Sequence, residues 1–222
     1  MRVKEKINLD RAGLIKNGAI TIVAFGDSVT HGRELEYGEV YHERLKRKIM
    51  PLCKCSPVNV INSGIGSTCA FDSTPRMESQ VFSHNPDLVI VAFGLNDVNY
   101  EIDVYLGALK TIFSECKNRD IETVFLTPNM TCTYLSKEAP PEHKETAKRL
   151  AKYQTEGRMD KYIYSAKELA LSMGIKVADA YSEWKELSKT QDVTLLLSNR
   201  INHPIAEMHE LFAEKIFEEI FA

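Results

Sequence analysis

Five short apolar runs alternate with segments of helical spacing along the chain, and this alternation restricts the fold more than any other feature. The runs are continuous rather than alternating in polarity, as expected for strands that are covered on both faces. They lie at residues 20–25, 58–62, 88–93, 122–127 and 175–178. Between them, apolar residues recur at helical spacing, and a last helix is expected at residues 205–221. This order predicts an α/β fold, in which helices cover both faces of a parallel sheet.

The size and charge of the chain limit its domain count and its partners. Its 222 residues suit one α/β domain, and we expect a single domain over residues 1–222 with residues 1–18 as an N-terminal extension. The net charge of −3 does not favour nucleic acid or an anionic membrane surface as the main partner. We find neither a secretory leader nor an apolar run of the roughly 18 residues that a spanning helix needs. A cytoplasmic protein without membrane insertion is therefore expected, while the sequence leaves the oligomeric state open.

The five cysteines agree with a reducing compartment. Their number is odd and no C-x-x-C pair occurs, so free thiols are expected rather than a disulfide framework. Cys53 and Cys55 are one residue apart and have no matching second pair, which a structural zinc site would require. We therefore predict no metal site.

A serine stands at the end of the first predicted strand. Residues 25–28 read Phe-Gly-Asp-Ser, so the strand is followed by a tight turn that carries Ser28. In open α/β sheets, the crevice at the carboxyl ends of the strands is where ligands bind. Ser28 is therefore a candidate reactive group.

Three further polar positions follow the later strands in order. Asn62-Ser63-Gly64 ends the second strand, and its glycine lets the backbone approach a ligand closely. Gly94-Leu95-Asn96-Asp97 follows the third strand and supplies the amide of Asn96 at the same edge. His203 lies on a loop before the last helix. Acyl transfer needs this combination, because a serine hydroxyl is a poor nucleophile until an imidazole takes its proton, and N–H donors must stabilise the oxyanion.

These four positions resemble the four sequence blocks of the SGNH-hydrolase family, also called the GDSL esterases/lipases. Gly26-Asp27-Ser28, Gly64, Gly94-x-Asn96-Asp97 and His203-Pro204 match the blocks in the order of the family, over roughly residues 20–220. The resemblance implies a three-layer α/β/α sandwich with a flavodoxin-like, five-stranded parallel sheet, and no cofactor.

The resemblance also implies a role for each residue. Ser28 is expected to be the nucleophile, and His203 the general base and then the acid. The backbone N–H groups of Ser28 and Gly64, with the Asn96 side chain, are expected to form the oxyanion hole. Asp27 and Asp97 are expected to brace the site.

One position departs from the family pattern. The family usually has an aspartate three residues before the histidine, where it orients the ring, but this chain has Arg200 there. A guanidinium only donates hydrogen bonds and cannot take this role. The alternatives are the side-chain carbonyl of Asn199, a backbone carbonyl, or a more distant carboxylate such as Asp192 or Asp179.

The stretch from Pro128 to Glu145 follows directly after a predicted strand and contains three prolines. A long connection at the carboxyl end of a strand is more often functional than idle, so we interpret it as part of the rim of the substrate site. The alternative is a solvated excursion.

Two functions are consistent with these observations. The first is a serine esterase that hydrolyses small carboxylic esters with short-chain acyl or acetyl groups, for which acetylated carbohydrate is one candidate substrate. The second, motivated by Arg200, is a catalytically impaired domain that binds an ester, a glycan or a protein partner without turnover.

Overall fold

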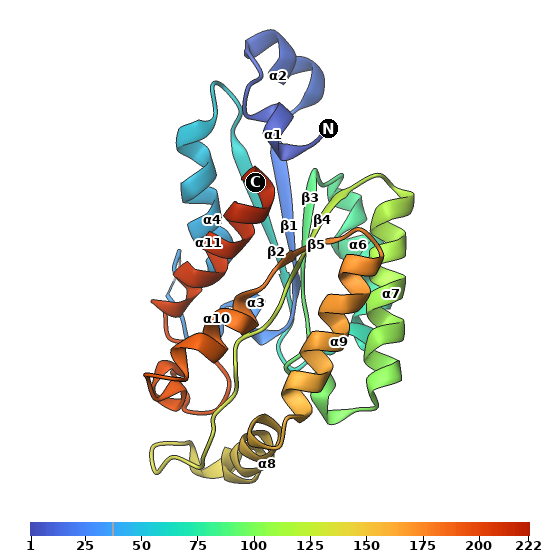
Figure 1. Ribbon diagram of the computed structural model, residues 1–222. Coiled ribbons are helices and arrows are strands. Elements are labelled where there is room, and N and C mark those ends of the chain that lie inside the picture. The colour runs from blue at the N-terminus through green and yellow to red at the C-terminus, as the bar shows by residue number, and fades with distance from the viewer. Residues whose placement is uncertain (37) are drawn as a thin grey trace.

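The computed structural model, which describes residues 1–36 and 38–222, contains a five-stranded parallel sheet in the order β2-β1-β3-β4-β5 (Figure 1). The strands are β1 (Ile20–Gly26), β2 (Val58–Gly64), β3 (Leu88–Ala92), β4 (Glu122–Leu126) and β5 (Lys176–Ala178). Each predicted strand is present within one or two residues of its expected ends. The side chains of the central strands β1, β3 and β4 are mostly buried, because helices cover both faces of the sheet, whereas the edge strand β2 is partly exposed.

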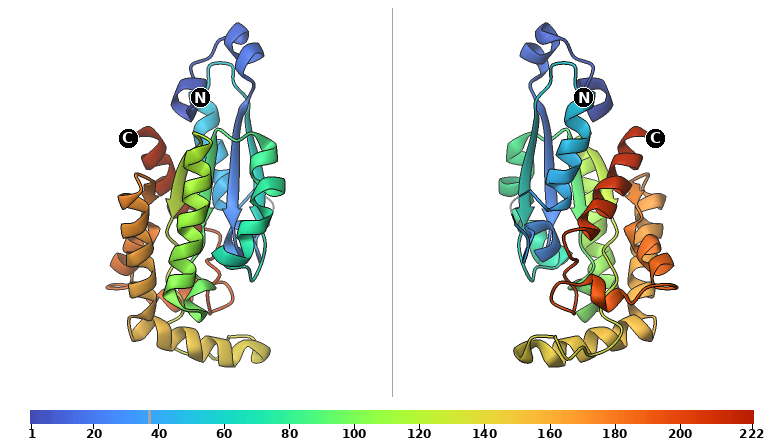
Figure 2. Two further views of the ribbon diagram at one scale, coloured as in Figure 1. Left: turned by 90° about the vertical axis from the view of Figure 1, so that its right-hand side faces the viewer. Right: turned by 90° about the vertical axis from the view of Figure 1, so that its left-hand side faces the viewer.

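Helices lie on both faces of the sheet, as the two side views show (Figure 2). The α4 and α11 helices pack together on one face, and α7 and α9 pack together on the other. The predicted three-layer, flavodoxin-like fold is therefore confirmed. In the described part of the chain, no helix is both long and apolar enough to span a lipid bilayer. The helices are α1 (Val3–Lys6), α2 (Arg11–Asn17), α3 (Ser28–His31), α4 (Tyr41–Ile49), α5 (Ala70–Ser73), α6 (Met77–Gln80), α7 (Ile102–Asn118), α8 (Lys144–Thr155), α9 (Arg158–Ser172), α10 (Ala180–Leu187) and α11 (Met208–Phe221).

The register of the central strands brings the predicted site residues to one edge. Gly26, at the end of β1, pairs with Gly64 of β2 on one side and with Ala92 of β3 on the other. The three strands therefore end at the same level. The segments that follow them carry Ser28, Ser67 and Asn96, and these residues meet at the carboxyl edge of the sheet.

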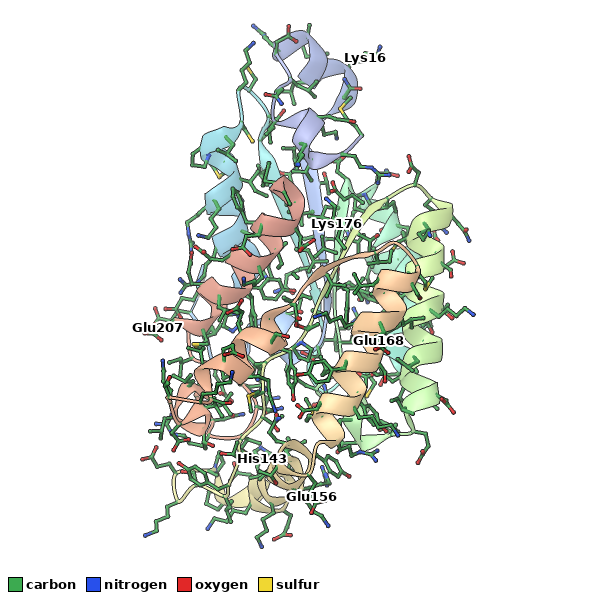
Figure 3. All side chains as sticks on the ribbon, in the orientation of Figure 1. Lys16, His143, Glu156, Glu168, Lys176 and Glu207 are labelled. Atoms are coloured by element: carbon green, nitrogen blue, oxygen red, sulfur yellow. The ribbon has the colours of Figure 1, made fainter. Side chains whose placement is uncertain are left out.

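The N-terminal helices lie at the opposite end of the molecule. Figure 3 shows Lys16 of α2 at one end and His143, just before α8, at the other. The α1 helix is tied to the core, since Val3 is fully buried and Lys6 forms a buried ion pair with Asp87 over 2.9 Å. The α1 helix of the predicted N-terminal extension thus packs against the core at the end of the sheet that is distant from Ser28, whereas α2 has no buried residue.

Candidate active site

Ser28 is held at the N-terminus of the short helix α3 by the turn that precedes it. The Asp27 carboxylate accepts a hydrogen bond from the Val29 N–H over 2.9 Å and so caps this helix. Gly26 is required for the turn, because a Cβ there would lie 2.1 Å from the hydroxyl oxygen of Thr30. Ser28 itself is 5% exposed. The turn therefore fixes the hydroxyl in a protected position at the end of β1.

His203 reaches Ser28 from a distant part of the sequence. Its Nε2 atom lies 3.0 Å from the Ser28 Oγ atom. Burial lowers the pKa of His203 below its ordinary value, although the neighbouring Glu34 raises it. An imidazole that is neutral near pH 7 and within hydrogen-bond distance of a serine hydroxyl can act as its general base.

The loop that carries His203 rests on the segment that follows β4. The Asn129 amide donates to the Asn202 carbonyl over 2.9 Å, and the Cys132 N–H donates to the Ile201 carbonyl over 2.8 Å. The first part of the 128–145 segment is therefore buried support for the histidine loop rather than a solvated excursion.

The Nδ1 atom of His203 has two neighbours. The Glu34 Oε1 atom lies 3.1 Å away, and the Asn199 Nδ2 atom also lies 3.1 Å away. Glu34 comes from the turn after α3, only six residues beyond Ser28. Sequence reasoning missed it, because no motif marks a carboxylate at this position. The one hint in the sequence was Arg200. Because it occupies the usual position of the aspartate, the carboxylate that orients His203 had to come from another part of the chain.

The structure resolves the alternatives for the group that orients His203. The Asn199 side-chain carbonyl already accepts the backbone N–H groups of Ile201, Asn202 and His203, so it does not accept from the ring. Its amide nitrogen faces the ring instead, which corrects the expectation that its carbonyl would do so.

Two other candidates are engaged elsewhere. Asp192 accepts from the Thr194 N–H and from the Tyr134 hydroxyl, and Asp179 caps α10 and pairs with Lys167. Among the described residues, neither carboxylate hydrogen-bonds to His203. Arg200 is turned away and forms an ion pair with Glu138 over 2.7 Å.

Gly64 does not present its N–H group to the cleft, contrary to expectation. That N–H donates to the Asn62 side chain over 2.9 Å. A Cβ at Gly64 would lie 2.2 Å from the backbone nitrogen of His31, so the glycine allows β2 to pack closely against α3. Ser67, three residues later, lines the cleft beside Ser28 and has a left-handed φ of 66°.

Asn96 lies in the cleft with one amide hydrogen committed. Its Nδ2 atom donates to the Thr68 carbonyl over 3.0 Å. A side-chain amide has two N–H donors, so this bond leaves one for a ligand. Asn96 therefore keeps one N–H for a ligand, and its role as an oxyanion donor stays a prediction.

Asp27 and Asp97 are both buried, and they are the sequence neighbours of Ser28 and Asn96. The Asp97 Oδ1 atom accepts from the Ala70 N–H over 2.8 Å at the start of α5, much as Asp27 caps α3. Burial raises the pKa of each carboxyl to about 7. Both hold backbone at the edge of the site, and neither contacts His203 in the described structure.

Ser28, Ser67, Asn96 and His203 line an open cleft of about 410 Å³, within the range of small-molecule sites. A second cleft of about 410 Å³ shares Ser67 and Asn96 with it. The 128–145 segment contributes the outer wall of the first cleft through Pro140, Glu142 and His143, which places this segment at the rim. The first cleft is also lined by Arg33, Glu34, Thr146, Asn199, Ile201 and Asn202. The second cleft is also lined by Cys69, Asn99, Tyr100, Arg149 and Tyr153.

The chain matches the model of the GDSL-like lipase/acylhydrolase family over residues 24–211. The matched range begins within β1 and ends within α11, and so contains Ser28, Asn96 and His203. One curated relative, the uncharacterized lipoprotein YqeF of Bacillus subtilis, is 29% identical over 86 residues. That alignment covers 39% of this chain and only 35% of the relative.

Solved structures share the fold over nearly the whole chain. The acetylxylan esterase Axe2 from Geobacillus stearothermophilus has a TM-score of 0.69 and 22% identity, over 90% of this chain and 94% of that one. A lipase/acylhydrolase from Enterococcus faecalis has a TM-score of 0.69 and 24% identity, over 90% of this chain and 95% of that one. At these identities the likeness establishes the architecture.

Proposed function

The chain belongs to the GDSL-like lipase/acylhydrolase family, and we propose that it is an ester-bond hydrolase that cleaves small carboxylic esters through an acyl-enzyme on Ser28. The contact of 3.0 Å between Ser28 Oγ and His203 Nε2, inside a polar cleft, is the observation that carries this proposal.

The first half of the reaction forms the acyl-enzyme. His203 Nε2 takes the Ser28 proton as Oγ attacks the ester carbonyl carbon, which gives a tetrahedral intermediate with a negative oxygen. His203 then donates that proton to the leaving alkoxide, and the alcohol departs. In the second half, His203 takes a proton from water as the water oxygen attacks the acyl carbon. The bond from that carbon to Ser28 Oγ then breaks, His203 returns the proton to Oγ, and the carboxylic acid is released.

Three N–H donors are available for the negative oxygen. They are the backbone N–H of Ser28 at the N-terminus of α3, the remaining amide hydrogen of Asn96, and the backbone N–H of Ser67. We place Ser67 in the position predicted for Gly64, because the Gly64 N–H is bonded to Asn62 and Ser67 lines the cleft. Preorganised donors of this kind contribute about 10²–10³ each in turnover.

The polar walls of the cleft support a short acyl group and a hydrophilic leaving group. Since His203 must protonate the leaving oxygen, the alcohol lies on its side of the cleft. Arg33, His143 and Thr146 line the cleft and can donate hydrogen bonds to hydroxyl groups of a substrate. We therefore propose an acetyl or other short acyl ester, with acetylated carbohydrate as the favoured substrate class. The acetylxylan esterase Axe2 shares this fold, which agrees with the proposal.

Hydrolysis of p-nitrophenyl acetate by the wild-type protein, beside Ser28→Ala, tests the proposal. We expect turnover that is lost in the variant, and labelling of Ser28 by a fluorophosphonate that requires His203. Equal background rates and no labelling would instead favour the binder without turnover. The carboxylate of Glu34 at His203 removes the observation that motivated that alternative.

We also propose a cytoplasmic location, supported by five cysteines that are all free thiols. Fractionation of cells that express the chain tests it, and recovery with the membranes or outside the cell would contradict it.

A further inference from the structure

Two groups of opposite hydrogen-bonding character meet the same nitrogen of His203. Glu34 Oε1 can only accept a hydrogen bond while it is ionised, and the Asn199 amide nitrogen can only donate one. Both lie 3.1 Å from Nδ1. Nδ1 cannot satisfy both partners at once, because it either carries a proton and donates or lacks one and accepts.

The orientation of the Asn199 amide is fixed by its surroundings. Its oxygen accepts three backbone N–H groups, at 2.9 Å from Ile201, 3.0 Å from Asn202 and 3.2 Å from His203. If the amide were flipped, its NH₂ group would face those three donors. The network therefore holds the nitrogen of Asn199 toward the ring.

The two partners stabilise different tautomers of a neutral His203. With Asn199 as the partner, Nδ1 accepts and the proton sits on Nε2, which then faces Ser28 and cannot take its proton. With Glu34 as the partner, Nδ1–H donates to the carboxylate and the Nε2 lone pair faces the hydroxyl. Only the second tautomer is a general base toward Ser28.

We propose, building on the esterase function above, that Glu34 is the positioning residue of this site and that it acts by outcompeting Asn199 for Nδ1 of His203. A hydrogen bond to an ionised carboxylate is roughly twice as strong as one between neutral groups, so the Glu34 partner prevails. The Asn199 amide keeps an acceptor in this state, since it also donates to Asn202 Oδ1 over 3.1 Å.

Glu34 is itself held for this role. Its second oxygen, Oε2, accepts from the Ser198 hydroxyl over 2.6 Å, and Ser198 belongs to the same loop as His203. The residue has a left-handed φ of 70°, a conformation that costs energy for a side chain of this kind. Glu34 therefore belongs to the loop that follows Ser28, but its side chain is hydrogen-bonded to the loop that carries His203.

The tautomer of His203 can be read directly by ¹⁵N NMR of the histidine side chains in the full chain. We expect Nδ1–H in the wild type and Nε2–H in Glu34→Ala, where Asn199 is the remaining side-chain partner of Nδ1 among residues 1–36 and 38–222. The same tautomer in both proteins would overturn the proposal, whether or not the wild type hydrolyses an ester. Failure of the esterase function would instead appear as no turnover by a wild type with Nδ1–H.

Kinetics with p-nitrophenyl acetate give the second test. Glu34→Ala should lower kcat by about 10⁴, the order of loss seen when an orienting carboxylate is replaced in a serine protease. Asn199→Asp keeps the oxygen that accepts the three N–H groups and places a second carboxylate oxygen at Nδ1. The double variant Glu34→Ala/Asn199→Asp should therefore have a kcat at least roughly ten-fold higher than that of Glu34→Ala. A double variant no faster than Glu34→Ala would contradict competition at Nδ1, and Glu36→Ala is the matched control for loss of charge from the same loop.

Discussion

The Ser198 hydroxyl donates a hydrogen bond to Glu34 Oε2 over 2.6 Å, and this bond joins two loops that are 164 residues apart in the sequence. One loop follows the nucleophile and the other carries the base. A hydrogen bond to a charged group contributes about 1.5–3 kcal/mol, which is enough to hold a half-exposed glutamate in one position.

Ser198→Ala should therefore loosen Glu34 without removing it. We expect kcat for p-nitrophenyl acetate to fall roughly ten-fold, with less change in KM, because Ser198 is not among the residues that line the cleft. Ser198→Thr keeps the hydroxyl and serves as the conservative partner. Full activity of the alanine variant would show that the Glu34–His203 contact is held without Ser198.

The pH dependence of turnover should reflect the environment of His203. Burial lowers the pKa of this residue below its ordinary value of 6.5, and Glu34 raises it. The neutral ring is the active base, so we expect the acid limb of kcat/KM to have its midpoint below pH 6.5. In Glu34→Ala the raising influence is lost, so the limb should move to lower pH while the plateau falls. A limb that moves to higher pH would contradict this assignment of causes.

The oxyanion donors give a set of three substitutions with different outcomes. Asn96→Ala should lower kcat by about 10²–10³, since it removes a side-chain donor. Ser67→Gly should keep kcat within a few-fold, because it preserves the N–H and relieves the left-handed φ of 66°. Gly64→Ala should reduce stability, because its Cβ would meet the His31 backbone nitrogen. Rates and thermal melts of the three variants check these expectations. If Gly64→Ala were stable but inactive, the Gly64 N–H would have to be an oxyanion donor after all.

The sequence alone predicted the strands and the motif residues, because local patterns of apolar and polar residues determine them. Continuous apolar runs identify all five strands, and the three central strands β1, β3 and β4 are buried on both faces. Ser28 and His203 were found because each stands in a short motif next to a recognisable element. The structure places them 3.0 Å apart, which no spacing in the sequence reveals, since the loops that carry them meet only after folding.

Other features depend on tertiary contacts that leave no local pattern. Glu34 lies in a loop without a motif, and its role follows only from its distance to His203. Gly64 looks like an exposed ligand-binding glycine in the sequence, whereas the packing of β2 against α3 explains it. The α10 helix, which contains the fully buried Trp184, was also not predicted.

Asp97 should make the stability of the protein depend on pH. Its Oδ2 atom is buried and has no hydrogen-bond partner in the described structure, and burial raises its pKa from 3.8 to about 7. The native state therefore retains a proton that the unfolded chain releases near pH 4. Stability from this group is present at low pH and is lost as the pH rises toward 7, after which it changes no further.

Asp97→Asn keeps a neutral group of the same shape at every pH, and its oxygen can still accept the Ala70 N–H. We expect its free energy of unfolding, relative to the wild type, to rise by roughly 2–3 kcal/mol between pH 5 and pH 8, at about 1.4 kcal/mol per pKa unit. Urea unfolding at the two pH values measures this, with Asp103→Asn on the surface of α7 as the control for a lost charge. A constant difference between Asp97→Asn and the wild type would show that Asp97 is already ionised in the folded protein at pH 5.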